Sequence, residues 1–226
     1  MPFFKQLDTM TDKSNYTKTL DKLQNIVHKE LKTFGYIKKG RTHNRIVDDG
    51  IVHVINFQSG EYPVGDNYII PGIRESYYGK FTVNLGIFVN DIYEVTQGQP
   101  AKDFIPEYIC QIRTRLPELT NSNDDWWAVD DNYIQLANEI ISELTTDAFK
   151  WFSNFTNREE IIKNLQNKKI KNLLIRIGKL NAGLIQIKID KRKGEELLRE
   201  HYKLSSEHKP HQEYVVELAK KVGVNI

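Results

Sequence analysis

The fold is decided by the stretch Lys80-Phe81-Thr82-Val83-Asn84-Leu85-Gly86-Ile87-Phe88-Val89-Asn90. Its side chains alternate between two faces, which is the period of a β-strand. We expect the first face to lie in the core beneath a helix, because it carries only apolar residues: Phe81, Val83, Leu85, Ile87 and Val89. The second face is polar enough to need no burial and carries Thr82, Asn84, Gly86, Phe88 and Asn90.

Strand-like segments stand on both sides of this stretch. Ile37–Val47 and Ile51–Gln58 are joined across Asp48-Asp49-Gly50, which is a strong hairpin signal. Tyr108–Leu116 follows a loop rich in Gly and Pro. The four segments therefore predict an antiparallel β-meander.

An amphipathic helix of about eighteen residues precedes the strands. It ends at the C-cap candidate Gly35. Its apolar side chains recur at helical spacing: Leu20, Leu23, Ile26, Val27, Leu31 and Phe34. We expect this helix to pack on the apolar face of the meander.

Helical spacing returns over Asn132–Lys150, and shorter helices follow the N-cap candidate Asn157. Leu180–Ile189 fits either a strand or a buried helix, and its helical neighbours favour the helix. The sequence therefore predicts an α+β fold, with an N-terminal helix packed on an antiparallel β-meander and a helical C-terminal region. We divide it into an N-terminal tail (1–16), an α+β domain (17–152) and a helical C-terminal extension (153–226).

Composition favours a globular protein in a reducing compartment. Hydrophobic residues make up 39% of the 226 residues, which is enough for a core. No apolar run approaches the length of a membrane span, the start lacks a signal peptide, and Cys110 has no second cysteine to pair with. We expect a cytoplasmic protein that contacts no membrane, with Cys110 as a small buried residue.

The charge is unevenly distributed. Residues 1–157 carry 16 Lys/Arg and 21 Asp/Glu, a net charge of −5, whereas residues 158–226 carry 16 and 9, a net charge of +7. A basic helical region can bind an anionic partner, although lysines among glutamates are more often the solvated faces of helices.

If the strands pair in sequence order, polar side chains from three of them line one surface. This predicted ligand-binding set comprises Asn56, Gln58, Asn84, Gln111, Arg113 and Arg115. Arginine forks and amides together can orient an anionic ligand. The alternative is an ordinary exposed sheet face whose side chains bond one another or water, and it is favoured. His53 is a conceivable general base with Arg113 or Arg115 nearby.

Sequence motifs indicate no catalytic residue, cofactor or metal. There is no phosphate-binding Gly-rich loop, no metalloprotease His pair and no Gly-x-Ser-x-Gly elbow. His201, His208 and His211 are expected to be exposed and unliganded. The tandem Trp126-Trp127 is expected to anchor the core, since Asp124, Asp125, Asp130 and Asp131 around it disfavour nucleic acid.

Five segments in a fixed order resemble the bacterial domain of unknown function 4304, over about residues 17–150. They are Gly35–Thr42, Val54–Gln58, Phe81–Ile87, Cys110–Leu116 and Trp126-Trp127. The resemblance implies a cytoplasmic α+β domain and supplies no catalytic residue.

Two classes of function remain open. The first, narrowly preferred, is a non-enzymatic protein-binding domain, such as an immunity-like accessory factor. The second is an enzyme or a binder of a small anionic ligand on the polar sheet face. A nucleic-acid partner is a minority interpretation, because the acidic first region has no overall basic field.

Overall fold

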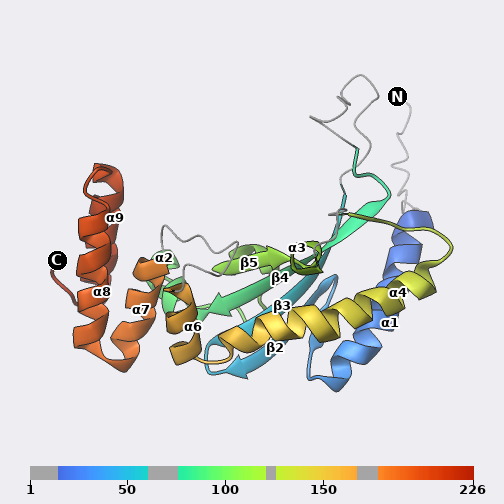
Figure 1. Ribbon diagram of the computed structural model, residues 1–226, viewed down its shortest axis with the longest axis horizontal. Coiled ribbons are helices and arrows are strands. Elements are labelled where there is room, and N and C mark those ends of the chain that lie inside the picture. Colours follow the sequence, from blue (N-terminus) through green and yellow to red (C-terminus); the bar gives the residue numbers. More distant parts are fainter. Residues whose placement is uncertain (1–14, 61–75, 121–125, 167–177) are drawn as a thin grey trace, which may run out of the picture.

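The computed structural model describes residues 15–60, 76–120, 126–166 and 178–226 (Figure 1). Six strands form one antiparallel sheet of order β1-β2-β3-β4-β5, and β6 pairs with β4 beside this path. The strands are β1 (Ile37–Lys39), β2 (Thr42–Asp48), β3 (Ile51–Ser59), β4 (Lys80–Val89), β5 (Ile112–Arg115) and β6 (Trp127–Ala128). The predicted α+β fold with an antiparallel meander is confirmed.

The helices of the part that carries the sheet are α1 (Asn15–Thr33), α2 (Asn90–Gln97), α3 (Leu116–Thr120), α4 (Tyr133–Glu143) and α5 (Phe149–Phe152). Four further helices follow: α6 (Arg158–Leu165), α7 (Gly178–Ile189), α8 (Lys191–Leu204) and α9 (Lys209–Lys221). Short 3₁₀ turns cover Glu107–Ile109 and Ser153–Phe155, and a π-helical turn covers Leu144–Ala148 between α4 and α5. Gly35 terminates α1 as predicted: the helix ends at Thr33, Gly35 has φ +84°, and the Gly35 and Tyr36 amides donate to the Lys32 and Leu31 carbonyls.

The first predicted strand is wrong in one respect. Ile37–Val47 does not form one strand but the hairpin β1–β2, in which Lys39 pairs with Thr42 across the turn Gly40-Arg41. Gly40 has φ +60°, a left-handed conformation that glycine adopts without strain. The hairpin predicted at Asp48-Asp49-Gly50 joins β2 to β3 and is confirmed.

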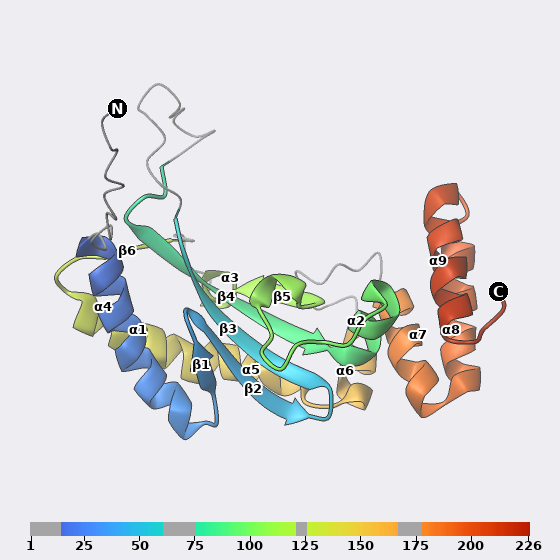
Figure 2. The same cartoon turned by 180° about the vertical axis from the view of Figure 1, so that it is seen from behind.

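The apolar face of β4 lies in the core, as predicted. Phe81, Val83, Leu85, Ile87 and Val89 are all fully buried. Figures 1 and 2 show α1, α4 and α5 on this same face of the sheet, which we call the core face. The register His43↔Ile55 and His53↔Ile87 brings two histidines to the core face.

The opposite, outer face differs from the prediction. Thr82, Asn84 and Phe88 are buried, although this face was expected to need no burial. Phe88 belongs to a second apolar cluster with Val52, Val54, Ile105 and Cys110. Residues 101–110, which we call the covering segment, pack over this face. Asn44 holds the segment: its Nδ2 donates to the Ile105 carbonyl at 2.9 Å, and its Oδ1 accepts from the Ile105 amide at 2.6 Å. The prediction of a buried Cys110 is confirmed.

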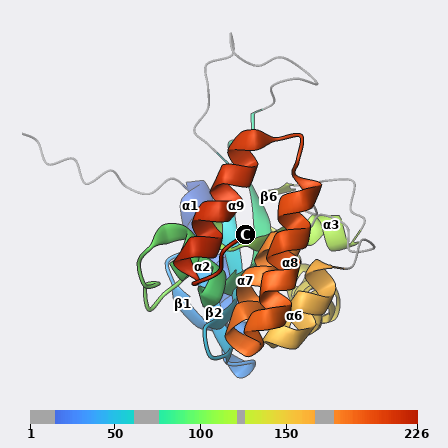
Figure 3. The ribbon, with the colours of Figure 1, turned by 90° about the vertical axis from the view of Figure 1, so that its left-hand side faces the viewer.

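Helices α7, α8 and α9 stand at the end of the sheet beside α2 (Figure 3). Asn157 caps α6 as predicted, since its Oδ1 accepts from the Glu160 amide at 3.0 Å, and Leu180–Ile189 is helical as favoured. In α6, Arg158 forms an ion pair with Asp91 of α2 at 2.7 Å and another with Asp48 at 3.7 Å. This guanidinium joins the C-terminal helices to the sheet.

The backbones of α7 and α8 are in close contact at Gly194. A Cβ atom on Gly194 of α8 would lie 2.6 Å from the backbone nitrogen of Ile187 in α7. Only glycine permits this approach. None of the described helices is long and apolar enough to cross a membrane.

Candidate functional site

Four of the six predicted ligand-binding residues lie together on the outer face. Asn56, Asn84 and Arg115 occupy one register row across β3, β4 and β5. The Asn84 Nδ2 donates to Gln58 Oε1 at 2.8 Å, and the Asn56 Nδ2 donates to Thr42 Oγ1 at 2.9 Å. We call Asn56, Gln58, Asn84 and Arg115 the polar row. Its amides bond one another and a neighbouring hydroxyl, as on an ordinary sheet face.

The other two predicted residues have separate partners. Gln111 Oε1 accepts a hydrogen bond from the Val89 amide at 2.8 Å, so it completes the backbone bonding at the end of β4. Arg113 forms a bidentate pair with the buried Glu107, with Nε–Oε1 at 2.5 Å and Nη2–Oε2 at 3.0 Å. These hydrogen bonds raise the pKa of Arg113. Gln111 and Arg113 therefore hold the covering segment and the strand end in place.

Arg115 differs from Arg113 because it forms no ion pair in the part of the chain that the structure describes. Its guanidinium carbon lies 5.9 Å from the ring centroid of Trp126, within the range of a cation–π contact. Trp126 stacks on Tyr77 with ring centroids 4.6 Å apart. Trp127 points to the other side and packs on Phe81 in the core. The core-anchoring prediction thus holds for Trp127 and is wrong for Trp126, which lies just before β6 begins and stacks on the exposed Tyr77, outside both apolar clusters.

His53 is not near the polar row. It lies on the core face, where its ring stacks on Phe152 with centroids 4.5 Å apart and its Nε2 is 2.9 Å from the Phe155 carbonyl oxygen. Burial lowers the pKa of His53 to about 4. The suggestion of a general base beside Arg113 or Arg115 is therefore wrong, because β3 alternates and the two arginines are on the outer face.

The C-terminal histidines are not an exposed trio. His201 of α8 is buried and its Nε2 lies 2.8 Å from the Nε2 of His211 in α9, while His208 is exposed. Burial, His211 and Lys179 lower the pKa of His201 to about 4. The described residues contain no group of three or more His, Cys, Asp or Glu side chains able to hold a metal ion. The histidine pair therefore acts as a hydrogen bond between α8 and α9.

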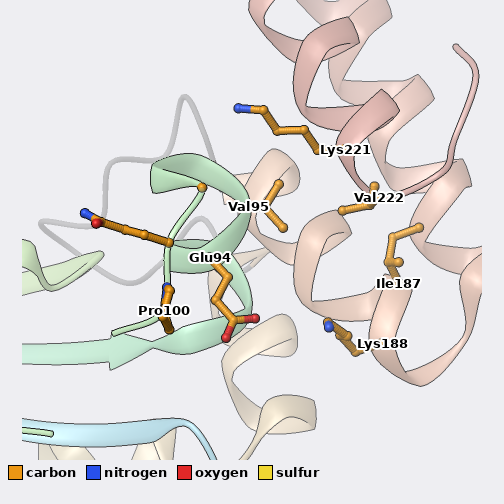
Figure 4. Close-up of a pocket in the computed structure, with 9 residues that line it drawn as sticks. Glu94, Val95, Pro100, Ile187, Lys188, Lys221 and Val222 are labelled. Atoms are coloured by element: carbon orange, nitrogen blue, oxygen red, sulfur yellow. The ribbon is translucent and has the colours of Figure 1, made fainter. Parts of the chain in front are cut away.

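A groove of about 700 Å³ lies between α2 and the ends of α7 and α9. Strand β4 runs directly into α2, and Asn90 Nδ2 bonds Glu94 Oε1 at 2.8 Å one turn later, which orients the α2 wall. Figure 4 shows an apolar centre with Lys221 at one end and Glu94 and Lys188 at the other. The residues that we call the α2/α9 groove include Glu94, Val95, Pro100, Ile187, Lys188, Lys221 and Val222.

No pattern in the sequence predicts this groove. Val95, Ile187 and Val222 each lie near the end of a helix, and no spacing links them in the chain. They meet because α7 and α9 pack against α2, which periodicity does not specify. The sequence shows only an apolar residue near each of three helix ends, which by itself does not indicate a groove.

One comparison with known proteins found a match. A family model described as Domain of unknown function (DUF4304) matches residues 27–154, which is more than half of the chain. No curated protein and no solved structure matches this chain. The matched region carries the α2 wall of the groove, and the residues beyond it carry the α7 and α9 walls. The chain belongs to the DUF4304 family, a domain of unknown function.

Proposed function

We propose that this protein is a non-enzymatic protein-binding domain whose partner enters the α2/α9 groove. The observation that carries the proposal is the groove itself. It is an open groove of about 700 Å³ on the surface of the protein. Its centre is apolar and its ends are charged, a layout that excludes water from the middle and orients a partner at the rim.

The groove residues support binding over catalysis. Among the described residues, the titratable side chains that line it are Glu94, Lys188 and Lys221, and two of these already have a partner within the protein. Glu94 accepts from Asn90, and Lys221 pairs with Glu217 at 2.9 Å. An acid–base mechanism requires titrating groups free to exchange protons with a substrate. This groove is instead suited to recognition.

The wider role that we propose is that of an immunity-like accessory factor in the bacterial cytoplasm. The net charges of −5 in residues 1–157 and +7 in residues 158–226 make the molecule dipolar. Such a charge separation speeds the encounter with a complementary partner and fixes its orientation. The groove lies where the two oppositely charged regions meet.

The test is affinity capture from the native host with a blocked groove. Gln99 is exposed and lines the groove, so Gln99→Trp fills it from the rim without removing core contacts. Gln97 is exposed on the same segment and is not a groove residue, so Gln97→Trp is the matched control. We expect wild type and Gln97→Trp to retain one stoichiometric protein and Gln99→Trp to lose it.

Equal melting temperatures of the three proteins would show that Gln99→Trp loses the partner because the groove is blocked and not because the protein unfolds. Capture of the same partner by Gln99→Trp would move the binding surface away from the groove. The absence of any stoichiometric partner for wild type would remove the proposal.

The second candidate is a small anionic ligand on the polar row, as predicted from Asn56, Gln58, Asn84, Gln111, Arg113 and Arg115. The observation that favours it is Arg115, whose guanidinium forms no ion pair among the described residues and whose backbone pairs in register with that of Asn84. Thermal-shift measurements with carboxylates and phosphates test it. Stabilisation that Arg115→Gln abolishes would support this candidate.

A further inference from the structure

We infer that a pocket on the core face of the sheet, which we call the Arg45 pocket, binds a small aromatic carboxylate. The pocket has a volume of about 310 Å³ and lies between β2, β3 and residues 149–156. It shares no lining residue with the α2/α9 groove, so the inference does not depend on the proposed function. The lining residues on which it rests are Tyr36, Arg45, His53, Phe149 and Phe152.

Arg45 supplies the positive charge of the pocket. The register Arg45↔His53 places the two residues opposite each other on β2 and β3, so their side chains project on the same face. Arg45 is half-buried and forms no ion pair in the part of the chain that the structure describes. Among the described residues, no Asp, Glu or Lys lines the pocket. The guanidinium charge is therefore not balanced there, and its planar fork can bind a carboxylate with two hydrogen bonds.

The charge of Arg45 acts on both polar rings beside it. Burial lowers the pKa of His53 to about 4, and the Arg45 charge acts in the same direction. Burial raises the pKa of Tyr36, and the Arg45 charge opposes that rise. Among the described residues, no carboxylate contributes to either shift. His53 is therefore neutral near pH 7, and the pocket carries the single positive charge of Arg45.

Aromatic rings form the walls of the pocket. The Tyr36 and Phe149 rings stack with an interplanar angle of 10° and centroids 6.1 Å apart, and the His53 and Phe152 rings stack at 16° and 4.5 Å. Tyr36 and Phe152 are buried, whereas Phe149 is half-buried. A planar ring of the ligand would cover the remaining surface of Phe149. An inorganic anion on Arg45 would leave that surface in water, so the walls favour an aromatic carboxylate.

His53 limits the ligand to one carboxylate. Its Nε2 lies 2.9 Å from the Phe155 carbonyl oxygen, which can only accept a hydrogen bond. The proton of the neutral ring is therefore on Nε2, and Nδ1 carries a lone pair. Nδ1 has no hydrogen-bond partner among the described residues. A second carboxylate would bring negative charge toward this lone pair and would find no second cation in the pocket.

The volume of the pocket sets the size of the ligand. At ~30 Å³ for each water-sized group, 310 Å³ has room for about ten such groups, which matches a single ring with one carboxylate. Ser153 also lines the pocket and is exposed, so the pocket is open to solvent on that side.

The experiment is an NMR titration of the full chain that follows the backbone amide signals. Benzoate is the probe that has both required features. Benzamide has the same shape without the charge, acetate lacks the ring, and isophthalate adds a second carboxylate. We expect benzoate to bind saturably, and roughly 10-fold or more tightly than each of the other three. The signals that shift should be those of residues 45–47 and 149–156.

Substitutions at two arginines locate the anion. Arg45→Gln removes the charge and should weaken benzoate binding by about 10-fold or more. Arg45→Lys keeps the charge without the planar fork and should weaken it less. Arg115→Gln is the matched control, because Arg115 also forms no ion pair among the described residues but lies on the outer face of the sheet. It should leave the affinity for benzoate unchanged. Melting temperatures establish that the variants are folded.

Several results would overturn the inference. They are an absence of saturable benzoate binding, a second probe that binds as tightly as benzoate, and an affinity that Arg45→Gln does not change. Loss of binding in Arg115→Gln alone would move the anion to the polar row. If Arg45→Gln does not fold, Arg45→Lys is combined with a search for NOEs between the benzoate ring and the Phe149 ring. An unchanged affinity without these NOEs then overturns the site.

Discussion

Acid should destabilise this protein well above the pH range in which its carboxylates titrate. His43 and His53 are buried on the core face of the sheet at 0% and 2% exposure. Burial, His28 and Lys38 lower the pKa of His43 to about 3, and burial lowers the pKa of His53 to about 4. Both rings are therefore mostly neutral in the folded state near pH 5, whereas both are mostly protonated in the unfolded chain.

The direction and size of the effect follow from proton linkage. A folded pKa below the unfolded value of 6.5 gives stability that is complete above pH 6.5 and falls as the pH drops. At pH 5 each histidine costs about 2 kcal/mol relative to pH 7.5. His43 and His53 together remove about 4 kcal/mol, a large part of the ~5–15 kcal/mol that stabilises a typical domain. His201, whose pKa is also lowered to about 4, adds to this loss. The loss from His53 levels off near pH 4 and that from His43 near pH 3.

Urea unfolding followed by tryptophan fluorescence at several pH values between 7.5 and 5, at constant ionic strength, measures this loss. His53→Gln cannot titrate, so it should reduce the difference in unfolding free energy between pH 7.5 and pH 5 by about 2 kcal/mol. His208→Gln, at an exposed histidine, is the control and should keep the wild-type difference. A wild type equally stable at both pH values, or an unchanged difference in His53→Gln, would show that the buried histidines do not cause the loss of stability in acid.

Two substitution experiments test the outer face by urea unfolding. Arg113→Ala leaves the buried Glu107 carboxylate without its bidentate partner and should lower the free energy of unfolding by about 1–3 kcal/mol. Arg115→Ala removes only a contact with the Trp126 ring face and should lower it by less than about 1 kcal/mol. Equal losses would mean that the two arginines do not differ as described. Asn44→Ala removes both hydrogen bonds to the buried backbone of Ile105 and should lower the free energy of unfolding by about 2–4 kcal/mol. A loss below about 1 kcal/mol would show that the covering segment does not depend on Asn44.

Local patterns predicted much of the fold. The alternation from Phe81 to Val89, the spacing of the first helix and the hairpin at Gly50 each depend on nearby residues, and all were correct. The turn at Gly40 was missed because polar residues on both sides continue the strand pattern. The sequence therefore predicts the presence of helices and strands better than it predicts the residues at which the chain turns.

The candidate site was less predictable because it depends on contacts between distant segments. Asn44 and Ile105 are 61 residues apart, and their bonds bury an outer face that composition alone marks as polar. Strand parity did bring Asn84 and Arg115 into one row, as expected. It could not indicate that Arg113 would be bound by Glu107, since that carboxylate lies outside the strands.

The glycine contact between α7 and α8 limits how the groove can change its width. Gly194 leaves no gap beside Ile187, so neither helix can slide along the other without first separating from it. Helices α7 and α8 therefore move together, and Ile187, which lines the groove, moves with them. Widening of the groove would therefore move α7 and α8 together relative to α2.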